Sequence, residues 1–436
     1  MKKLLKITGI SLLLLLALLF LLPFFFKGQI LSLVKSEINQ NLAAHVDFKD
    51  LDLSFFRRFP RVSVKLENVS VIGQDSFAKD TLLSAPGIDV AVNLLSFFKK
   101  DREVYRVDIE SPRIHALVNG NGKANWDVAK PSGPTTATDT AGTFSLKLQR
   151  YGIHNAYVYY SDETLGAKAE VFGLDHEGKG DFTQDQFTLS TSTQSTGASF
   201  SYAGIPYLAN SETSIESDIV IDTKKNKYVF DKTTLKVNKL TLTTDGSVQT
   251  LSDSSYAMDL RFKAPSTDFK ELLSLIPALY KKDFDNLKTS GSASFGGFVK
   301  GVYSPSQLPA YDVIANVQNG SFQYPDLPAT VKNINLNLHA SNRDGAPDNT
   351  VLDISKAHIE MNGEPFDFHL LYKNPVSAPY VDGAAKGRID LSQVAKFIKL
   401  EAGTKLAGMV NADAFAKGQL SALQAKQGAF TAGGFL

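Results

Sequence analysis

Apolar and polar residues alternate along many short stretches of the chain after residue 46. Alternation with a period of two places the apolar side chains on one face of a β-strand and the polar ones on the other. Gly- and Asn-rich turn signals such as residues 119–122 separate these stretches, which predicts successive strands of a sheet. The apolar residues expected to share one face are Val62, Val64, Leu66, Ile88, Val90, Val92, Leu94, Ile334, Leu336, Leu338, Phe366, Phe368 and Leu370.

Two arrangements of the strands are compatible with such an apolar face. In a sandwich or barrel, two such faces bury each other and form a closed core. In one long curved sheet, the concave face stays open as a groove, and it would suit acyl chains whose headgroups remain in solvent. The alternation fits both arrangements.

The first segment of the chain has a different pattern. Residues 7–26 contain no charged residue, and ~20 residues at ~1.5 Å each span roughly 30 Å, the thickness of a bilayer core. Lys2, Lys3 and Lys6 precede this run, so the N-terminus is expected in the cytoplasm. A cleaved secretory signal shares these features. No small-x-small cleavage pattern follows the run, so we expect an uncleaved anchor.

Residues 27–44 carry apolar side chains at helical spacing. This amphipathic helix would either lie on the bilayer surface or cap the first strands, and we expect the cap. The apolar-poor residues 131–142 are rich in Pro, Thr and Gly, which predicts a linker or flexible loop.

Two further helices are predicted at residues 268–280 and 390–400. Each begins with Asp and has Glu271 or Gln393 three residues later, which is similar to a capping box. A glycine and a Lys-Gly pair follow each helix in the same order: Gly291 with residues 300–301, and Gly408 with residues 417–418. This recurrence indicates a repeat. The second copy reaches residue 436 after its first strands, so we expect the sequence to be a fragment.

Composition restricts the function classes. A chain of 436 residues, 43% apolar and 21% charged, predicts several domains or an elongated repeating body. The net charge of +1 gives no basic field for nucleic acid. The chain has no cysteine, so packing and backbone pairing must stabilise it without disulfides or zinc-thiolate sites.

No catalytic motif stands out. Metalloprotease, nucleophile-elbow and phosphate-loop patterns are absent from the sequence, and the seven histidines are scattered. We therefore expect no catalytic, cofactor or metal site. A carboxylate pair from distant strands would make an exported carbohydrate-active enzyme, which is a distant alternative. Trp126, beside a Gly-Asn turn, is interpreted as a packing anchor, with a binding platform as the alternative.

Several stretches together resemble the AsmA-like family of Gram-negative bacteria. They are the N-terminal apolar run and amphipathic helix, FPRVSVKLENVSV at 59–71, NGNGKANWDV at 119–128, NGSFQYPDLPATVKNINLNLHASN at 319–342, NPVSAPYVDG at 374–383 and GRIDL at 387–391. The resemblance covers most of the chain and is weakest over residues 131–255. It implies an anchor in the bacterial inner membrane, a periplasmic body with a chorein-like start, and a β-groove like that of bridge-type lipid transfer proteins.

We therefore expect a mainly β protein with an N-terminal transmembrane helix, an elongated, curved antiparallel sheet and a few short amphipathic helices. It would be a non-enzymatic, single-pass protein that binds phospholipid acyl chains and moves them toward the outer membrane. The alternative is a scaffold that influences protein targeting to, or assembly in, the outer membrane by binding polypeptide at a strand edge. The expected segments are 1–6 (cytoplasmic), 7–26 (anchor), 27–130 (helix and chorein-like region), 131–142 (linker), 143–266 (middle groove segment), 267–387 (repeat) and 388–436 (start of a second repeat).

Overall fold

The fold was analysed on a computed structural model, which describes part of the chain. The described residues are 28, 31–32, 35–36, 38–40, 42–58, 61–92, 102–128, 144–145, 148–252, 254–275, 286–304, 307–323, 331–361, 363–394, 405, 407–425 and 430–435. The predicted anchor, the predicted linker at 131–142 and Leu94 lie outside them. Among the helices described, none is both long and apolar enough to cross a bilayer.

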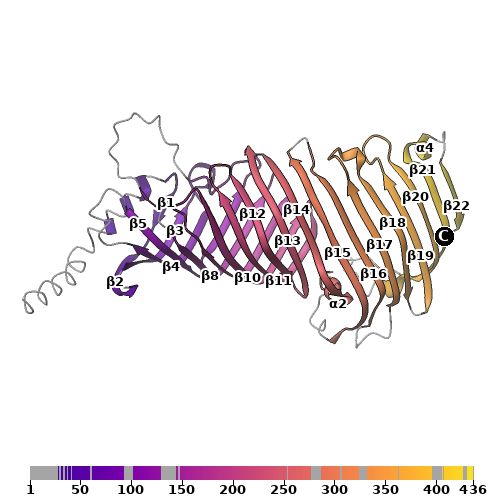
Figure 1. The fold of residues 1–436 in the computed structure, drawn as a ribbon, viewed down its shortest axis with the longest axis horizontal. Coiled ribbons are helices and arrows are strands. Elements are labelled where there is room, and N and C mark those ends of the chain that lie inside the picture. The colour runs from indigo at the N-terminus through magenta and orange to yellow at the C-terminus, as the bar shows by residue number, and fades with distance from the viewer. Residues whose placement is uncertain are drawn as a thin grey trace, which may run out of the picture. The chain divides into compact units, whose positions relative to one another are not determined.

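The described chain is mainly β, with antiparallel pairing predominant and only short helices (Figure 1). This confirms the mainly β class predicted from the alternation. The chain divides into two compact units, Met1–Gln184 with Thr193–Asn210, and Asp185–Ser192 with Ser211–Leu436. Strands β10 (Gln186–Tyr202) and β11 (Ile205–Asp222) contribute residues to both.

The first unit combines antiparallel and parallel pairing. Its strands are β1 (His45–Asp47), β2 (Asp50–Arg58), β3 (Arg61–Ile72), β4 (Thr81–Val92), β5 (Arg102–Glu110), β6 (Arg113–Val118), β7 (Phe144–Ser145), β8 (Arg150–Asp162) and β9 (Ala167–Lys179). Strands β2 to β5 pair antiparallel in chain order. Strand β8 then runs parallel to β5 along its first part and to β6 along its second. Non-adjacent segments are thereby brought side by side.

The second unit is an antiparallel meander. Its remaining strands are β12 (Lys227–Val237), β13 (Leu240–Ser252), β14 (Ser255–Asp268), β15 (Lys288–Tyr303), β16 (Ala310–Gln323), β17 (Val331–Asn342), β18 (Val351–Met361), β19 (Glu364–Lys373), β20 (Tyr380–Asp390), β21 (Met409–Gln419) and β22 (Thr431–Phe435). From β11 to β22, each strand pairs with the next one in the chain. Register shifts interrupt each pairing from β11–β12 to β18–β19.

The predicted helix caps occur, but one predicted helix is shorter than expected. Asp222 pairs with Lys227 across the charged turn between β11 and β12. Helix α2 (Phe269–Leu273) begins after Asp268, whose carboxylate accepts a hydrogen bond from the Lys270 backbone N–H at 3.3 Å. The helix ends at Leu273, and residues 274–275 form a turn, so the prediction of a continuous helix over residues 268–280 is wrong. Pro277 disfavours helical geometry in the residue before it.

The recurring segments have like local geometry. Helix α3 (Leu391–Val394) follows Asp390, whose carboxylate accepts a hydrogen bond from the Ser392 N–H at 2.8 Å. The following glycines, Gly291 and Gly408, have φ of 97° and 105°, a region that favours glycine. The lysine of each Lys-Gly pair forms an ion pair with an aspartate of the preceding strand. A third short helix, α4 (Leu420–Ala425), follows β21.

Candidate functional site

The predicted apolar residues of the first unit lie directly opposite one another. Val62 pairs with Val92, Val64 with Val90, and Leu66 with Ile88 across β3 and β4. Directly opposed residues share a face of the sheet, so the apolar residues of both strands lie on the same face.

The apolar residues of β17 and β19 also share a face, although β18 separates them. Ile354 lies between Leu338 and Leu370 in the register, and Ala357 lies between Leu336 and Phe368. Ile334, nearer one strand end, lies opposite Gly320, and Phe366 lies opposite Ile359. The sequence predictions for these strands therefore converge on one surface of the second unit.

This apolar surface continues across most of the meander. One row of directly opposed residues runs from β14 to β22 without a polar side chain. Its members are Ala264, Phe295, Ala315, Leu338, Ile354, Leu370, Gly383, Ala416 and Ala432. We call the face of the second unit that carries this row the apolar face.

The opposite face of the second unit is lined with ion pairs between neighbouring strands. The ion pairs are Arg261–Asp245, Lys300–Asp259 and Lys417–Asp382, and hydrogen bonds join His339 to Asp312 and His358 to Asp367, with N–O distances of 2.7–3.1 Å. The hydrogen bond to Asp382 raises the pKa of Lys417 above its ordinary value. Such exposed pairs each contribute little to stability, but charges on this face keep it in water. The sheet of the second unit is thus amphipathic.

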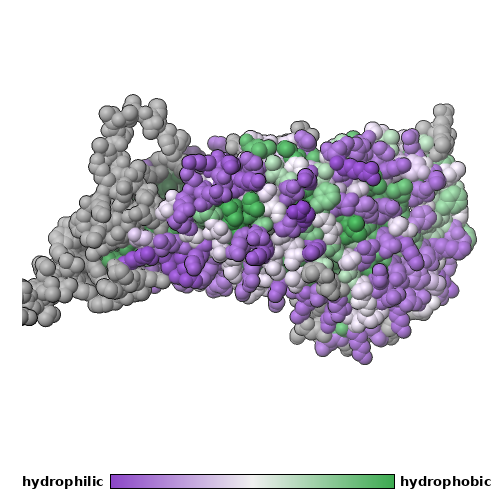
Figure 2. Space-filling view, in the orientation of Figure 1, coloured by the Kyte–Doolittle hydropathy of each residue, from purple (hydrophilic) through white to green (hydrophobic). Residues whose placement is uncertain are grey.

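The side chains of the apolar face are only half-buried along the middle of the strands. Leu336, Leu338, Leu370 and Phe366 fall in this intermediate class, and Phe368 is 36% exposed. In a sandwich, the corresponding side chains would be covered by a second sheet. On the side of the molecule seen in Figure 2, hydrophobic residues form patches among hydrophilic ones.

One end of the apolar face is covered by helix α2. Phe269 and Leu273 of the helix are buried in a cluster with residues of β15, β16 and β17. Leu336 and Ile334 pack against the border of this cluster. The helix therefore closes one end of the surface, while the central row lies outside the cluster.

The apolar side of the first unit is covered more fully. Val62 and Val92 are 4% and 6% exposed and are buried with Val104 and Leu148. In a second cluster around Phe48, Leu51 and Val69, the partly buried residues include Leu66, Ile88 and the helical residues Leu31 and Ile38. This is the contact predicted for an amphipathic helix that caps the first strands. Leu148 lies outside a strand, just before β8, and packs in this core.

Trp126 and the histidines, which were considered as binding or metal-ligating residues, contact other side chains of the fold. Trp126 is 41% exposed, and its ring centroid lies 6.1 Å from that of Tyr160. His339 and His358 belong to the ion-paired face. His176 is half-buried beside Tyr151 and Thr193, and this burial lowers its pKa. Over the described ranges, no three His, Asp or Glu side chains are grouped in a way that could hold a metal ion.

Some contributors to these surfaces were missed by the sequence analysis. Val104, Tyr151 and Phe182 join the apolar cluster of the first unit, although no simple alternation marks them. The pairing of β8 with both β5 and β6 places Tyr151 opposite Val107. A parallel connection between segments so far apart leaves no local signal in the sequence.

The structure defines a class of protein: a mainly β protein in which a meander of strands has one apolar and one charged face. The family model of the AsmA family matches residues 1–289. The chain belongs to the AsmA family, as its sequence motifs suggested. Comparisons with curated proteins and with solved structures find no match.

Proposed function

We propose that this chain is a non-enzymatic lipid carrier whose apolar face forms a groove for phospholipid acyl chains. The observation that carries the proposal is the row of apolar residues from Ala264 to Ala432, opposite a face of ion pairs. Apolar surface left in water costs about 25 cal/mol per Å². An acyl chain would cover this surface and needs no polar partner.

Membership of the AsmA family is consistent with a role in lipid transport or outer-membrane biogenesis. In this proposal, residues 7–26 anchor the chain in the bacterial inner membrane, and the sheet lies in the periplasm. The groove would accept lipid from the anchored side and pass it toward the outer membrane. A run of neighbouring strands suits this task because each adds about 4.8 Å to an apolar path.

Site-specific photo-crosslinking tests the proposal. A photoreactive amino acid at Leu338, on the apolar face, should yield phospholipid adducts when the full chain is irradiated in its native membrane and analysed by mass spectrometry. Asn337 is the matched control, because it is the preceding residue, is exposed and lies on the opposite face. It should give at least tenfold less lipid adduct.

The other outcomes distinguish the alternatives. Polypeptide adducts at Leu338 without lipid would support the scaffold that binds protein. Crosslinks from Leu338 only to residues of the same chain would mean that the apolar face is sealed, and the groove would be rejected. Equal lipid labelling at Leu338 and Asn337 would indicate non-specific contact with the bilayer and would also contradict the proposal.

A further inference from the structure

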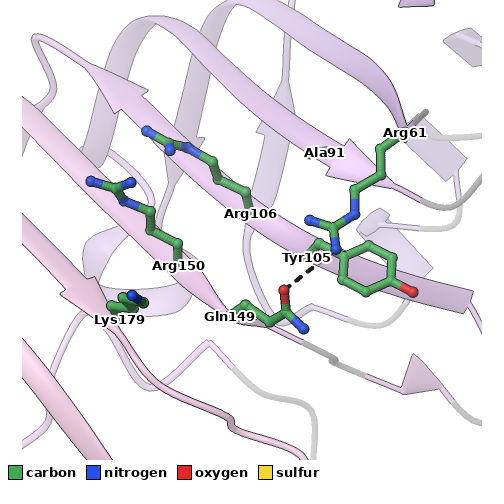
Figure 3. Close-up of a pocket in the computed structure, with 7 residues that line it drawn as sticks. All are labelled: Arg61, Ala91, Tyr105, Arg106, Gln149, Arg150 and Lys179. Atoms are coloured by element: carbon green, nitrogen blue, oxygen red, sulfur yellow. Dashed lines mark hydrogen bonds between the residues drawn. The ribbon is translucent and has the colours of Figure 1, made fainter. Parts of the chain in front are cut away.

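A basic pocket lies in the first unit, on the side of the sheet that does not carry Val62, Val64 and Val90. Its volume is about 300 Å³, at the small end of the range of ligand pockets. Its lining comes from β3, β4, β5, β8 and β9 and from Gln149, which directly precedes β8; the lining residues are Arg61, Ala91, Tyr105, Arg106, Gln149, Arg150 and Lys179. The guanidinium groups of Arg106 and Arg150 extend in the same direction (Figure 3). The lining contains four cationic side chains and no carboxylate.

The strand register forces three of these cations together. Arg106 lies directly opposite Arg150 in the parallel pair β5–β8, and Arg150 lies directly opposite Lys179 in the antiparallel pair β8–β9. Like charges at directly opposed positions destabilise a sheet. A row of three such positions is therefore unfavourable unless negative charge compensates it.

Carboxylates of the same unit compensate two of the cations. Arg106 binds Asp108 through two hydrogen bonds of 2.5 and 2.8 Å, and the Asp108 side chain is only 4% exposed. This pairing raises the pKa of Arg106 above its ordinary value. Arg150 forms an ion pair with Glu177 at 2.5 Å, which lowers the pKa of Glu177.

The other two cations have no carboxylate partner among the described residues. The Arg61 guanidinium lies 3.8 Å from the centroid of the Tyr105 ring and donates a long hydrogen bond of 3.4 Å to the neutral Gln149 (Figure 3). No ion pair of Lys179 is found within the part of the chain that the structure describes. These partners orient Arg61 but leave its charge, and that of Lys179, uncompensated.

We infer that this pocket binds a phosphate group, with Arg61 and Lys179 supplying the uncompensated charge. Two positive charges match a phosphate dianion better than a single carboxylate. The guanidinium fork of Arg61 fits phosphate oxygens, and the compact ammonium of Lys179 serves as a point charge. Arg106 and Arg150 add donors at the pocket wall, although their own carboxylates hold them in place.

The phosphate can come from a phospholipid headgroup or from a small water-soluble molecule. Both present phosphate oxygens to the pocket, as a phosphodiester monoanion in phosphatidylglycerol and mainly as a dianion in a small phosphate monoester. The site is independent of the proposed acyl-chain groove, because the apolar cluster of the first unit lies on the other side of the strands and the apolar face belongs to the second unit. Failure of one proposal therefore leaves the other standing.

Direct titration tests the inference. The full chain, in a non-ionic detergent at low salt, is titrated by calorimetry with inorganic phosphate, glycerol 3-phosphate and a dihexanoyl phosphatidylglycerol below its micelle concentration. We expect saturable binding of one phosphate compound per chain that weakens with added salt. Lys179→Gln and Arg61→Gln should each weaken it by about tenfold. Arg106 is left intact, because its removal would leave the buried Asp108 carboxylate unpaired.

Lys168→Gln is the matched control. Lys168 is an exposed lysine of the same strand, β9, so its replacement removes the same net charge away from the pocket and should leave binding unchanged. Tighter binding of the short-chain lipid than of glycerol 3-phosphate would identify a headgroup site, and equal binding would identify a site for small phosphates. Absence of saturable binding, or equal loss in Lys168→Gln and Lys179→Gln, would overturn the inference.

Discussion

Strands β3–β4 and β17–β19 carry the same alternation of apolar and polar residues, yet their apolar sides are covered to different degrees. In the first pair, Val62 and Val92 are 4% and 6% exposed. In the second group, Leu338 and Leu370 are half-buried, and Phe368 is 36% exposed.

The difference comes from what covers each surface. Leu148 and Phe182, from segments far along the chain, pack with Val62 and Val92. In the second unit, helix α2 covers one end of the apolar face and leaves the central row. Alternation thus determines which side of a strand is apolar. Whether that side becomes a closed core or stays partly exposed depends on which other segments cover it.

The largest difference in stability between the two regions is expected when a charge is introduced on the apolar side of each. Val62→Asp places a carboxylate among buried apolar side chains, so we expect a loss on the order of 4 kcal/mol in the free energy of unfolding. Leu338→Asp has access to water and should cost less than about 1.5 kcal/mol. Hydrogen exchange read by mass spectrometry would measure the loss separately in each unit.

The same pair of variants also separates folding from binding. Leu338→Asp should keep the protection of β17 and reduce the lipid recovered with the purified chain. Loss of protection throughout the second unit in this variant would mean that the central row is a closed core.

Removal of the Phe269 side chain should show how much helix α2 contributes. Phe269→Ala deletes a buried ring from the cluster with Leu273 and Val317, and we expect a loss of about 3 kcal/mol. Exchange in β15 to β17 would report it. Phe298→Ala, at an exposed position of β15, is the matched control and should change stability by less than about 1 kcal/mol. Similar losses in both variants would contradict a specific covering role for the helix.

Acidification should weaken the first unit through His176. Burial lowers the pKa of this imidazole in the folded state, whereas the unfolded chain has an ordinary value near 6.5. The stabilisation is therefore full above the unfolded pKa and is lost as the pH falls through that value toward the lower folded pKa. Tyr151 and Thr193, whose hydroxyl groups are hydrogen-bonded to the ring, carry no negative charge that would stabilise the protonated imidazole.

Chemical denaturation between pH 7.5 and pH 5 measures this dependence. His176→Gln should flatten the slope of stability against pH in the first unit, and His369→Gln, at an exposed position of β19, should not. An unchanged slope in His176→Gln would assign the pH dependence to other groups.

The smallest effect is expected on the ion-paired face. His339→Gln removes the 2.8 Å contact with Asp312, and an exposed pair of this kind contributes at most about 1 kcal/mol. Thermal unfolding should change little, and lipid crosslinking at Leu338 should be unaffected. A loss comparable to that of Phe269→Ala would show that the charged face stabilises the sheet more than its exposure implies.

The sequence predicted the features that depend on local pattern. Period-two alternation predicted β3, β17 and β19, and Asp268 and Asp390 precede helices as the capping pattern predicted. The predicted apolar residues that the structure describes in β17 and β19 share one face, because the register follows the hydrophobic pattern.

Features that depend on pairing between distant segments could not be predicted from local sequence patterns. The basic pocket needs Arg106, Arg150 and Lys179 side by side, and the parallel pairing of β5 with β8 is what brings Arg106 to the other two. The spacing of these residues along the chain does not indicate that they meet. The net charge of +1 also does not reveal that positive charge is concentrated at one place. The apolar residues Leu275 and Ile276 continue the helical spacing and so predict a longer helix than α2, which ends at Leu273.

The next-neighbour pairing of β11 to β22 has a consequence for how such chains diversify. Each hairpin contacts mainly the hairpins before and after it, so stability is close to a sum of local terms, as in other repeat proteins. A duplicated or deleted hairpin would change the length of the apolar face by about two strand widths and leave the remaining pairings intact. Related chains can therefore differ in reach through gain or loss of whole hairpins, without redesign of a shared core.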